Sequence, residues 1–303
     1  MSRTHPLSRR LTLLILWAAL PFAGLALLAA CAPTATLNVL AARDGAAQAR
    51  DLAYGPLARH RLDVYRPSAP APAAGWPVVV FFYGGSWTDG ERADYKFVGS
   101  ALAARGVLTL VADYRLYPAV RYPDCLNDCA LAAAHGLERA AALGGDPKRV
   151  YLMGHSAGAY NAAMLALDPR WLKGTGHTPG ELAGWIGLAG PYDFLPMSNR
   201  FAQPVFFHPN SPAGTQPLDY AAKDSPRAFL GAARIDKLVD PQRNSVGLAG
   251  RLQAVGAPVE IKLYERVNHV TLAAALAWPL HWLAPVLDDV MAFIGRPAPA
   301  PPG

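Results

Sequence analysis

The stretch VYLMGHSAGAYN, residues 150–161, places Ser156 between Gly154 and Gly158, where an apolar, strand-like run gives way to an alanine-rich, helix-like one. This context is typical of a nucleophile elbow, a sharp strand-to-helix turn that holds a serine in strained backbone geometry. Small residues two positions before and after the serine let the chain pass itself closely. The helix N-terminus faces the serine, and the N–H of Ala157 is expected to point to where an oxyanion would form. We therefore expect Ser156 to be a nucleophile.

Strand-like and helix-like runs alternate on both sides of this turn. The predicted strands are 61–65, 78–82, 107–112, 149–153, 185–189, 228–232 and 259–264, and the predicted helices are 97–105, 125–143, 157–167, 244–255 and 272–294, the last broken near Pro279 and Pro285. This order predicts an α/β fold with a mainly parallel, twisted sheet and helices on both faces. The proline-rich stretch 194–226 is expected to form a small lid insertion after the strand 185–189, counted as the sixth strand of the fold.

The first thirty residues have the pattern of an export signal. Three arginines precede an apolar run, 11–28, that ends in small residues. The tetrapeptide LAAC ending at Cys31 resembles the bacterial lipobox, and the resemblance implies that Cys31 is acylated and becomes the mature N-terminus. A plain signal peptide or an uncleaved membrane anchor is the alternative.

A lipid-anchored chain is expected on the periplasmic side of a bacterial membrane. Alanine rather than aspartate at position 32 favours an outer-membrane lipoprotein. Residues 31–50 are alanine-rich and predict a flexible tether. One domain of 51–303 follows, because 303 residues with 52% hydrophobic content fit a single α/β domain with a sizeable core.

Charge and cysteine content limit the possible partners. The formal net charge of +6 arises from singly scattered arginines, without the lysine-rich tracts of nucleic-acid binders, so nucleic acid is not an expected partner. Cys125 and Cys129 lie four residues apart. An oxidising compartment permits a bridge between them, but this spacing is strained on a regular helix, so paired and free thiols both remain open. Neither a metal nor a cofactor is expected.

A serine nucleophile needs a histidine to take its proton and a carboxylate to hold that histidine's tautomer. On a parallel sheet these side chains are expected in loops after the last strands. Among the eight histidines, only His269 follows the last predicted strand by a few residues. The carboxylate is expected after the strand 228–232, where Asp236 comes first. Asp240 and Asp193 are the alternatives to Asp236, although each also fits a role in shaping its own loop.

The loop after the strand 78–82 reads YGGSW. Glycines let backbone N–H groups approach a ligand closely, so Gly84 and Gly85 are expected to complete an oxyanion hole with Ala157. The candidate pocket residues are aromatic side chains of this loop and of the proline-rich stretch, Tyr83, Trp87, Phe206 and Phe207.

Together these motifs resemble the esterase/lipase branch of the α/β-hydrolase superfamily, which includes hormone-sensitive-lipase-like, kynurenine-formamidase-like and bacterial feruloyl-esterase-like enzymes. The resemblance spans about 62–294. It is carried by LDVYRP at 62–67, YGGSW at 83–87, DYRL at 113–116, GHSAG at 154–158, and DKLV at 236–239 with His269. It implies an α/β-hydrolase fold and an exported serine carboxylesterase that hydrolyses small carboxylic esters through an acyl-enzyme. An amidase, formamidase or peptidase on the same residues, or a catalytically idle binding lipoprotein, is the alternative.

One motif departs from the family pattern. The family has a histidine followed by two or three glycines in the oxyanion loop, whereas here Tyr83 replaces the histidine and Ser86 the third glycine. Because the donors are backbone amides, the oxyanion hole is expected to persist. The side-chain hydrogen bond that orders the loop must then come from the tyrosine hydroxyl or be lost. Asp113 and Arg115 are expected to brace the loop after their own strand.

Overall fold

The computed structural model describes residues 33–40 and 49–295. The predicted export signal, residues 1–30, and the predicted acylation site, Cys31, lie outside the described residues. Within the two described ranges, no helix is both long enough and apolar enough to cross a membrane.

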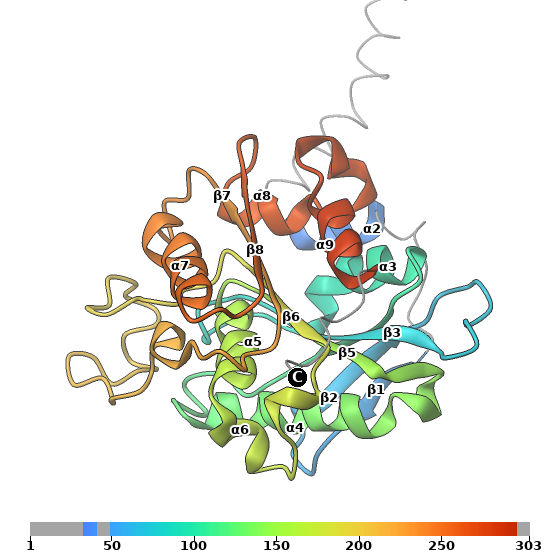
Figure 1. The fold of residues 1–303 in the computed structure, drawn as a ribbon, viewed down its shortest axis with the longest axis horizontal. Coiled ribbons are helices and arrows are strands. Elements are labelled where there is room, and N and C mark those ends of the chain that lie inside the picture. Colours follow the sequence, from blue (N-terminus) through green and yellow to red (C-terminus); the bar gives the residue numbers. More distant parts are fainter. Residues whose placement is uncertain (1–32, 41–48, 296–303) are drawn as a thin grey trace, which may run out of the picture.

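An eight-stranded sheet forms the centre of the molecule (Figure 1). Its strands are β1 (Ala49–Ala53), β2 (Arg61–Tyr65), β3 (Trp76–Phe82), β4 (Leu108–Ala112), β5 (Gly145–His155), β6 (Gly184–Leu188), β7 (Ala228–Ala233) and β8 (Val259–Tyr264). They are ordered β1-β2-β4-β3-β5-β6-β7-β8. The pairs β1·β2 and β2·β4 are antiparallel, and every pair from β4 to β8 is parallel. The mainly parallel sheet predicted from the sequence is therefore confirmed.

Helices cover both faces of this sheet. They are α2 (Pro33–Leu40), α3 (Lys96–Ala104), α4 (Asp124–Arg139), α5 (Ala157–Leu167), α6 (Pro169–Lys173), α7 (Gly247–Ala254), α8 (His269–Ala274) and α9 (Val286–Gly295). Figure 1 shows α4, α5 and α6 below the sheet and α2, α3 and α9 above it. Because the central strands are covered on both sides, they consist of continuous apolar runs, and residues 78–82 of β3 are fully buried.

Three predicted helices differ from the observed ones at their ends. The helix predicted over 125–143 ends at Arg139 and is followed by a 3₁₀ turn, Ala141–Leu143. The helix predicted over 244–255 begins with a π-helical turn, Gln242–Val246. The predicted 272–294 helix is split into α8, a 3₁₀ helix at Trp278–Leu283 and α9. Its prolines lie where helices begin, since proline is tolerated in a first turn but not in a helix interior.

The predicted tether, 31–50, differs from the structure over the residues described. Residues 33–40 form α2, whose Asn38 donates its side-chain N–H to the carbonyl of Ala93 at 2.8 Å and accepts the N–H of Phe97 at 3.0 Å. Leu37 packs against the core. The alanine-rich composition of this stretch does not predict the helix, because its packing depends on one leucine and one asparagine whose partners lie elsewhere in the chain.

The connection between β6 and β7, residues 189–227, lies where the lid insertion was predicted. It holds one 3₁₀ helix, Pro217–Tyr220, and otherwise turns and loops. It contributes one wall of the pocket described below. Its action as a lid remains a prediction.

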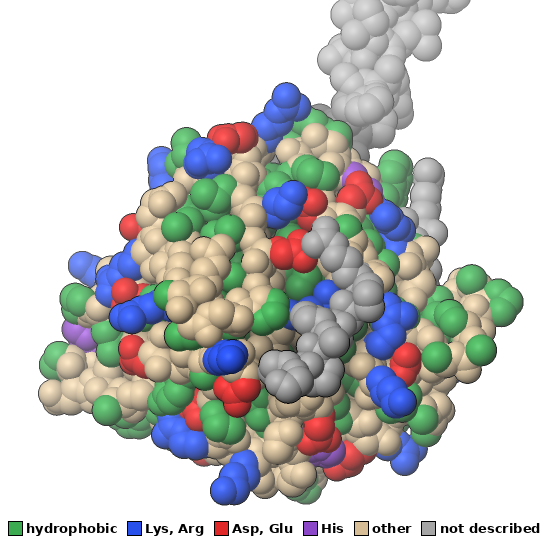
Figure 2. Space-filling view, viewed as in Figure 1, with side chains coloured by type: hydrophobic (Ala, Val, Ile, Leu, Met, Phe, Trp, Pro, Cys, Tyr) green, Lys and Arg blue, Asp and Glu red, His purple; other side chains and the backbone are tan. Residues whose placement is uncertain are grey.

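Basic and acidic side chains are interspersed on the face shown in Figure 2. Positive charge on this face is therefore not gathered into a single stripe.

Candidate active site

Ser156 lies at the junction of β5 and α5. Its backbone has φ 54° and ψ −120°, a conformation that non-glycine residues rarely adopt. A hydrogen bond to the neighbouring strand holds Ser156 in this conformation, because its N–H donates to the carbonyl of Leu188 at 2.8 Å. A strained turn of this kind projects the hydroxyl away from the sheet and into the pocket.

Both glycines of the elbow are required by close backbone contacts. A Cβ atom on Gly154 would lie 2.1 Å from the carbonyl oxygen of Gly158, and one on Gly158 would lie 2.0 Å from that of Phe82. Real Cβ atoms essentially never approach so closely. The predicted need for small residues on each side of Ser156 therefore has a direct steric cause.

The structure brings Ser156, His269 and Asp236 into one hydrogen-bonded chain. The Nε2 atom of His269 lies 2.8 Å from the Ser156 hydroxyl, and its Nδ1 atom lies 2.7 Å from a carboxylate oxygen of Asp236. His269 is the first residue of α8. Asn268 caps this helix by accepting the N–H groups of Val270 and Thr271, each at 3.0 Å. The cap sets the direction in which the His269 side chain leaves the backbone.

Asp236 is held in place by its own loop. Its second carboxylate oxygen accepts the N–H groups of Leu238 and Val239 at 2.8 and 3.0 Å. Burial would raise the pKa of Asp236, but hydrogen bonding to His269, the charge of that imidazole and the two N–H groups together lower it. The carboxylate is therefore ionised at neutral pH, as a group that orients an imidazole must be.

The two alternative carboxylates are engaged elsewhere. Asp240 accepts the N–H of Gln242 at 2.9 Å, at the start of the π-helical turn. Asp193 forms a two-point ion pair with Arg243, with N···O distances of 2.9 and 3.0 Å. Each shapes a loop, and neither is recorded as a partner of His269.

The predicted oxyanion donors do not lie in equivalent environments. Ala157 begins α5 and Gly85 lies in an irregular loop with φ 126°. Over the residues described, the N–H groups of these two residues have no recorded partner. Gly84 lies next to the elbow, since a Cβ atom on it would lie 3.0 Å from Cβ of Ser156. The expectation that Gly84 takes part in the oxyanion hole stays a prediction.

The loop with Tyr83 in place of histidine is ordered by the tyrosine hydroxyl. This hydroxyl donates to Asp113 at 3.1 Å and accepts from the guanidinium of Arg59 at 2.9 Å. Arg59 also donates to the carbonyl of Gly90, at the far end of the loop. The hydroxyl of Tyr114 donates to the carbonyl of Tyr83 at 2.7 Å. Of the two outcomes expected for this substitution, the structure has the ordered one.

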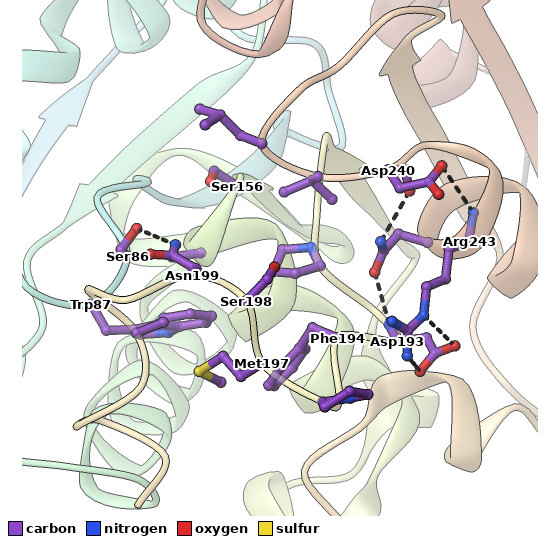
Figure 3. A pocket seen from close by; sticks show the side chains of 17 residues that line it. Ser86, Trp87, Ser156, Asp193, Phe194, Met197, Ser198, Asn199, Asp240 and Arg243 are labelled. Carbon is purple, nitrogen blue, oxygen red and sulfur yellow. Dashed lines mark hydrogen bonds and ion pairs between the residues drawn. The ribbon is translucent and has the colours of Figure 1, made fainter. Parts of the chain in front are cut away.

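A pocket of about 130 Å³ opens beside Ser156 (Figure 3). It is lined by Ser86, Trp87, Ser156, Ala157, Pro191, Asp193, Phe194, Pro196, Met197, Ser198, Asn199, Ala202, Leu238, Val239, Asp240, Arg243 and Asn244. Figure 3 shows Trp87, Met197 and Phe194 along one side and the Asp193·Arg243 pair at the other. The pocket therefore has an apolar side and a polar end.

Only Trp87 of the four predicted pocket residues is in this lining. Tyr83 is fully buried beneath the loop. Phe206 lies behind Trp87, with ring centroids 4.8 Å apart, and Phe207 lies under the guanidinium of Arg121. The positions of Phe206 and Phe207 depend on the path of residues 189–227 over the sheet. The aromatic character of these two residues does not reveal that path.

Sequence reasoning missed several pocket residues. The side-chain N–H of Asn199 donates to the Ser86 hydroxyl at 3.0 Å and so joins the β6–β7 connection to the oxyanion loop (Figure 3). Ser86 and Trp87 have φ angles of 53° and 58°, so this loop is strained as the elbow is. For Asn199, the only sequence signal was the general one that 194–226 would adjoin the site.

The remaining predicted residues lie below the site. Arg115 forms a two-point pair with the buried carboxylate of Asp128, the nearer N···O distance being 2.7 Å, and so braces the loop after β4 as expected. Cys125 and Cys129 are buried free thiols on α4. Burial raises the pKa of Cys125 to about 12, which makes it a poor nucleophile. Within residues 33–40 and 49–295, no group of three or more histidine, cysteine or acidic side chains is arranged to bind a metal.

Comparison with known proteins places this geometry in a family. The family model described as BD-FAE matches residues 62–252, more than half of the chain. The chain belongs to the BD-FAE family. The matched segment of this BD-FAE protein includes the oxyanion loop, the elbow and Asp236, and it ends before His269.

Curated relatives carry esterase names. Isoprenylcysteine alpha-carbonyl methylesterase ICME of Arabidopsis thaliana is 32% identical over 244 residues, which cover 74% of this chain and 56% of that protein. Esterase LipQ of Mycobacterium tuberculosis is 28% identical over 229 residues, covering 70% and 54%. The BD-FAE chain thus spans little more than half the length of these relatives.

Solved structures share the fold. Apo esterase 2 of Thermogutta terrifontis superimposes with a TM-score of 0.68 at 22% identity, covering 84% of this chain and 97% of that one. A truncated carbohydrate esterase from gut microbiota gives the same TM-score at 18% identity, with the same coverage. The BD-FAE chain therefore has an α/β-hydrolase fold.

Proposed function

We propose that this protein is a serine carboxylesterase that hydrolyses small carboxylic esters through an acyl-enzyme. The observation that carries the proposal is the chain of hydrogen bonds from Ser156 through His269 to Asp236, with N···O distances of 2.8 and 2.7 Å. Family membership and the esterase names of the curated relatives support the same reaction class.

In the first step the Nε2 atom of His269 takes the hydroxyl proton of Ser156 as the serine oxygen attacks the ester carbonyl. Asp236 holds the other ring nitrogen, so that the lone pair is on Nε2, and it stabilises the imidazolium that forms. The carbonyl oxygen becomes an oxyanion. The N–H groups of Gly85 and Ala157, which form no backbone hydrogen bond within residues 33–40 and 49–295, are proposed to bind it.

In the second step the imidazolium gives its proton to the departing alkoxide, and the C–O bond to the alcohol breaks. The acyl group remains on Ser156. A water molecule then loses a proton to His269 and attacks the acyl carbonyl, and the serine oxygen leaves with that proton. Free acid and free enzyme result, and no step requires a cofactor.

The dimensions of the pocket favour a short substituent next to the carbonyl. A cavity of about 150 Å³ accommodates roughly one benzene-sized group, and the pocket here is about 130 Å³. We therefore propose that one side of the ester bond carries a small group, and that the other side extends toward solvent.

We also propose that the chain is exported and is anchored in a bacterial membrane through acylation of Cys31. Its support is the apolar run 11–28 followed by LAAC. Mass spectrometry of the mature N-terminal peptide should find an acylated cysteine. In a Cys31→Ala variant the protein should leave the membrane fraction.

Comparison of the wild type with Ser156→Ala tests the enzymatic proposal. The full-length chain is assayed on p-nitrophenyl esters of increasing acyl length, on an aryl formamide and on a peptide amide. Wild type should hydrolyse short esters fastest, and Ser156→Ala should lose roughly 10³-fold or more in kcat. Ser211→Ala, a serine change outside the pocket lining, should behave as wild type.

Other outcomes identify the alternatives. Faster cleavage of the formamide or peptide would make the protein an amidase or a peptidase. Failure of Ser156 to react with a fluorophosphonate probe, together with no ester turnover, would make it a catalytically idle binding protein.

A further inference from the structure

His155 occupies the variable position of the elbow, directly before Ser156, and the mechanism above gives it no role. Its side chain is buried, and its Nε2 atom lies 2.8 Å from the backbone carbonyl oxygen of His269. The two imidazole rings lie 5.0 Å apart between centroids, at an interplanar angle of 47°. His155 therefore contacts the residue that carries the proposed general base, 114 positions away in the sequence.

The tautomer of His155 follows from its partner. A carbonyl oxygen only accepts hydrogen bonds, so Nε2 must carry the proton and donate. The Nδ1 atom is buried and has no recorded partner among the described residues. Burial, and then the neighbouring charge of His269, lower the pKa of His155 to about 3, although the hydrogen bond to the His269 carbonyl and the charge of Asp236 act in the opposite direction. His155 is thus a neutral donor at every pH at which an esterase of this kind would work.

This hydrogen bond joins the backbones of the nucleophile and the base. Ser156 is tied to β6 through the carbonyl of Leu188, and its immediate neighbour His155 is tied to the first residue of α8. Without His155, the position of His269 relative to Ser156 would depend on the Asn268 cap and on the hydrogen bonds that the His269 ring itself makes. Those bonds change during the reaction, because the imidazole gains and loses a proton.

The other edge of the His155 ring faces the oxyanion loop. A Cβ atom on Gly84 would lie 3.2 Å from Nδ1 of His155 and 3.0 Å from Cβ of Ser156. One buried ring is therefore packed between the backbone of the base and the loop that offers the Gly85 N–H. A shift of that ring would move both.

We propose that His155 is a positioning residue, which holds the backbone of His269 in register with Ser156 through its Nε2–H. It remains uncharged while His269 becomes an imidazolium, so it adds no repulsion at the step where the base gains charge. This inference rests on the proposed function, because the register it preserves is that of the proposed nucleophile and base.

Three variants test the proposal in the full-length chain. His155→Leu keeps a comparable volume but has no donor. His155→Gln restores an N–H near the position of Nε2. His60→Gln is the matched control, since His60 is a buried histidine that pairs with Asp128 and lies outside the pocket lining. Each is assayed for kcat and KM on p-nitrophenyl acetate, for the rate of fluorophosphonate labelling, and for the midpoint of thermal unfolding.

His155→Leu should lose at least tenfold in kcat with KM within about twofold, because transition-state alignment rather than substrate binding is affected. Its labelling rate should fall in parallel. His155→Gln should recover to within about threefold of wild type. His60→Gln should keep wild-type kcat even if its unfolding midpoint falls, which separates lost alignment from lost stability.

Two results would overturn the proposal. One is wild-type kcat and labelling in His155→Leu. The other is equal loss in the leucine and glutamine variants, which would assign the effect to ring packing rather than to the donor. If the wild type labels but hydrolyses no ester, the proposed function fails and the labelling rates still decide the role of His155. If the wild type does not label at all, both proposals fail.

Discussion

The two sides of Ser156 are positioned by different means. On the side of the base, Ser156, Asp236 and His269 each follow the end of a strand, β5, β7 and β8, and backbone contacts of one or two neighbouring residues set their directions. On the side of the oxyanion loop, the residues from Tyr83 to Gly90 are held by side chains from distant segments. The positions of Ser156, Asp236 and His269 depend on few residues, so we expect a single substitution among them to cause a large loss of activity. The position of the oxyanion loop depends on many residues, so we expect each single substitution there to cause a smaller loss.

The largest effect is expected from crowding in the elbow. Gly154→Ala places a methyl group 2.1 Å from a backbone oxygen, so β5 and α5 must separate. We expect loss of soluble protein, or a soluble protein with less than about a thousandth of wild-type kcat. Soluble yield, unfolding midpoint and ester turnover measure it.

Gly250→Ala is the matched control for that change. Nothing lies within 4 Å of a Cβ there, and the residue is inside α7. Alanine should stabilise the protein by about 0.5–1 kcal/mol. A well-folded, active Gly154→Ala variant would show that the elbow is not set by backbone crowding.

The next largest effect is expected at the carboxylate. Asp236→Asn keeps the shape of the side chain but removes the charge that stabilises the imidazolium, so kcat should fall by about 10²–10⁴ with little change in the unfolding midpoint. Asp240→Asn should stay within about threefold of wild type, because asparagine can still cap the turn at Gln242. A reversed order of the two losses would make Asp240 the acid.

A smaller effect is expected in the oxyanion loop. Tyr83→Phe removes the hydroxyl that joins Arg59 and Asp113, so kcat should fall by about tenfold, and the free energy of unfolding by about 1–3 kcal/mol. Tyr65→Phe removes a buried hydroxyl that forms no hydrogen bond with the described part of the chain, so kcat and the free energy of unfolding should change little. If the two variants behave alike in turnover and in denaturant unfolding, the hydroxyl network does not order the loop.

The smallest effect is on stability in acid. The pKa of His155 is lowered to about 3 in the folded protein, below the value of 6.5 for an exposed histidine, so the unfolded chain binds more protons between these values. His155 therefore contributes to the free energy of unfolding above pH 6.5, where its contribution is complete. This contribution is lost progressively as the pH is lowered from about 6.5 toward 3. His155→Gln should show a smaller loss between pH 7 and pH 5 in denaturant titrations. An unchanged loss would show that His155 does not titrate in this way.

Much of this site could be predicted from the sequence, because its residues lie in a short motif or directly after predicted strands. The elbow is a contiguous motif, and Asp236 and His269 follow apolar strands in the order expected of the sheet. Their convergence follows from a parallel sheet, whose strand ends meet at one edge. The share of the Gly84 N–H in the oxyanion hole stays a prediction, because a GG pair does not reveal which of its two N–H groups faces the substrate.

Other features could not be predicted from local patterns. The inward packing of α2 depends on the hydrogen bonds of Asn38 to residues 55 and 59 positions further along the chain, and on Leu37, which packs against the core. The pocket walls depend on how the turns of 189–227 fold against the sheet, and composition does not specify that path. The predicted pocket residue Phe206 is apolar enough for a pocket, yet it supports Trp87 from behind.

The amino-acid sequence thus determined the sheet, the strained serine and the order of nucleophile, acid and base, because strand periodicity, glycine sterics and chain order are local properties. Tertiary structure alone decided which of the predicted aromatic side chains lines the pocket, how Tyr83 orders its loop, and that His155 reaches the backbone of His269. These outcomes depend on contacts between segments far apart in the chain, where a difference of about 1 Å between two atoms separates a hydrogen bond from none.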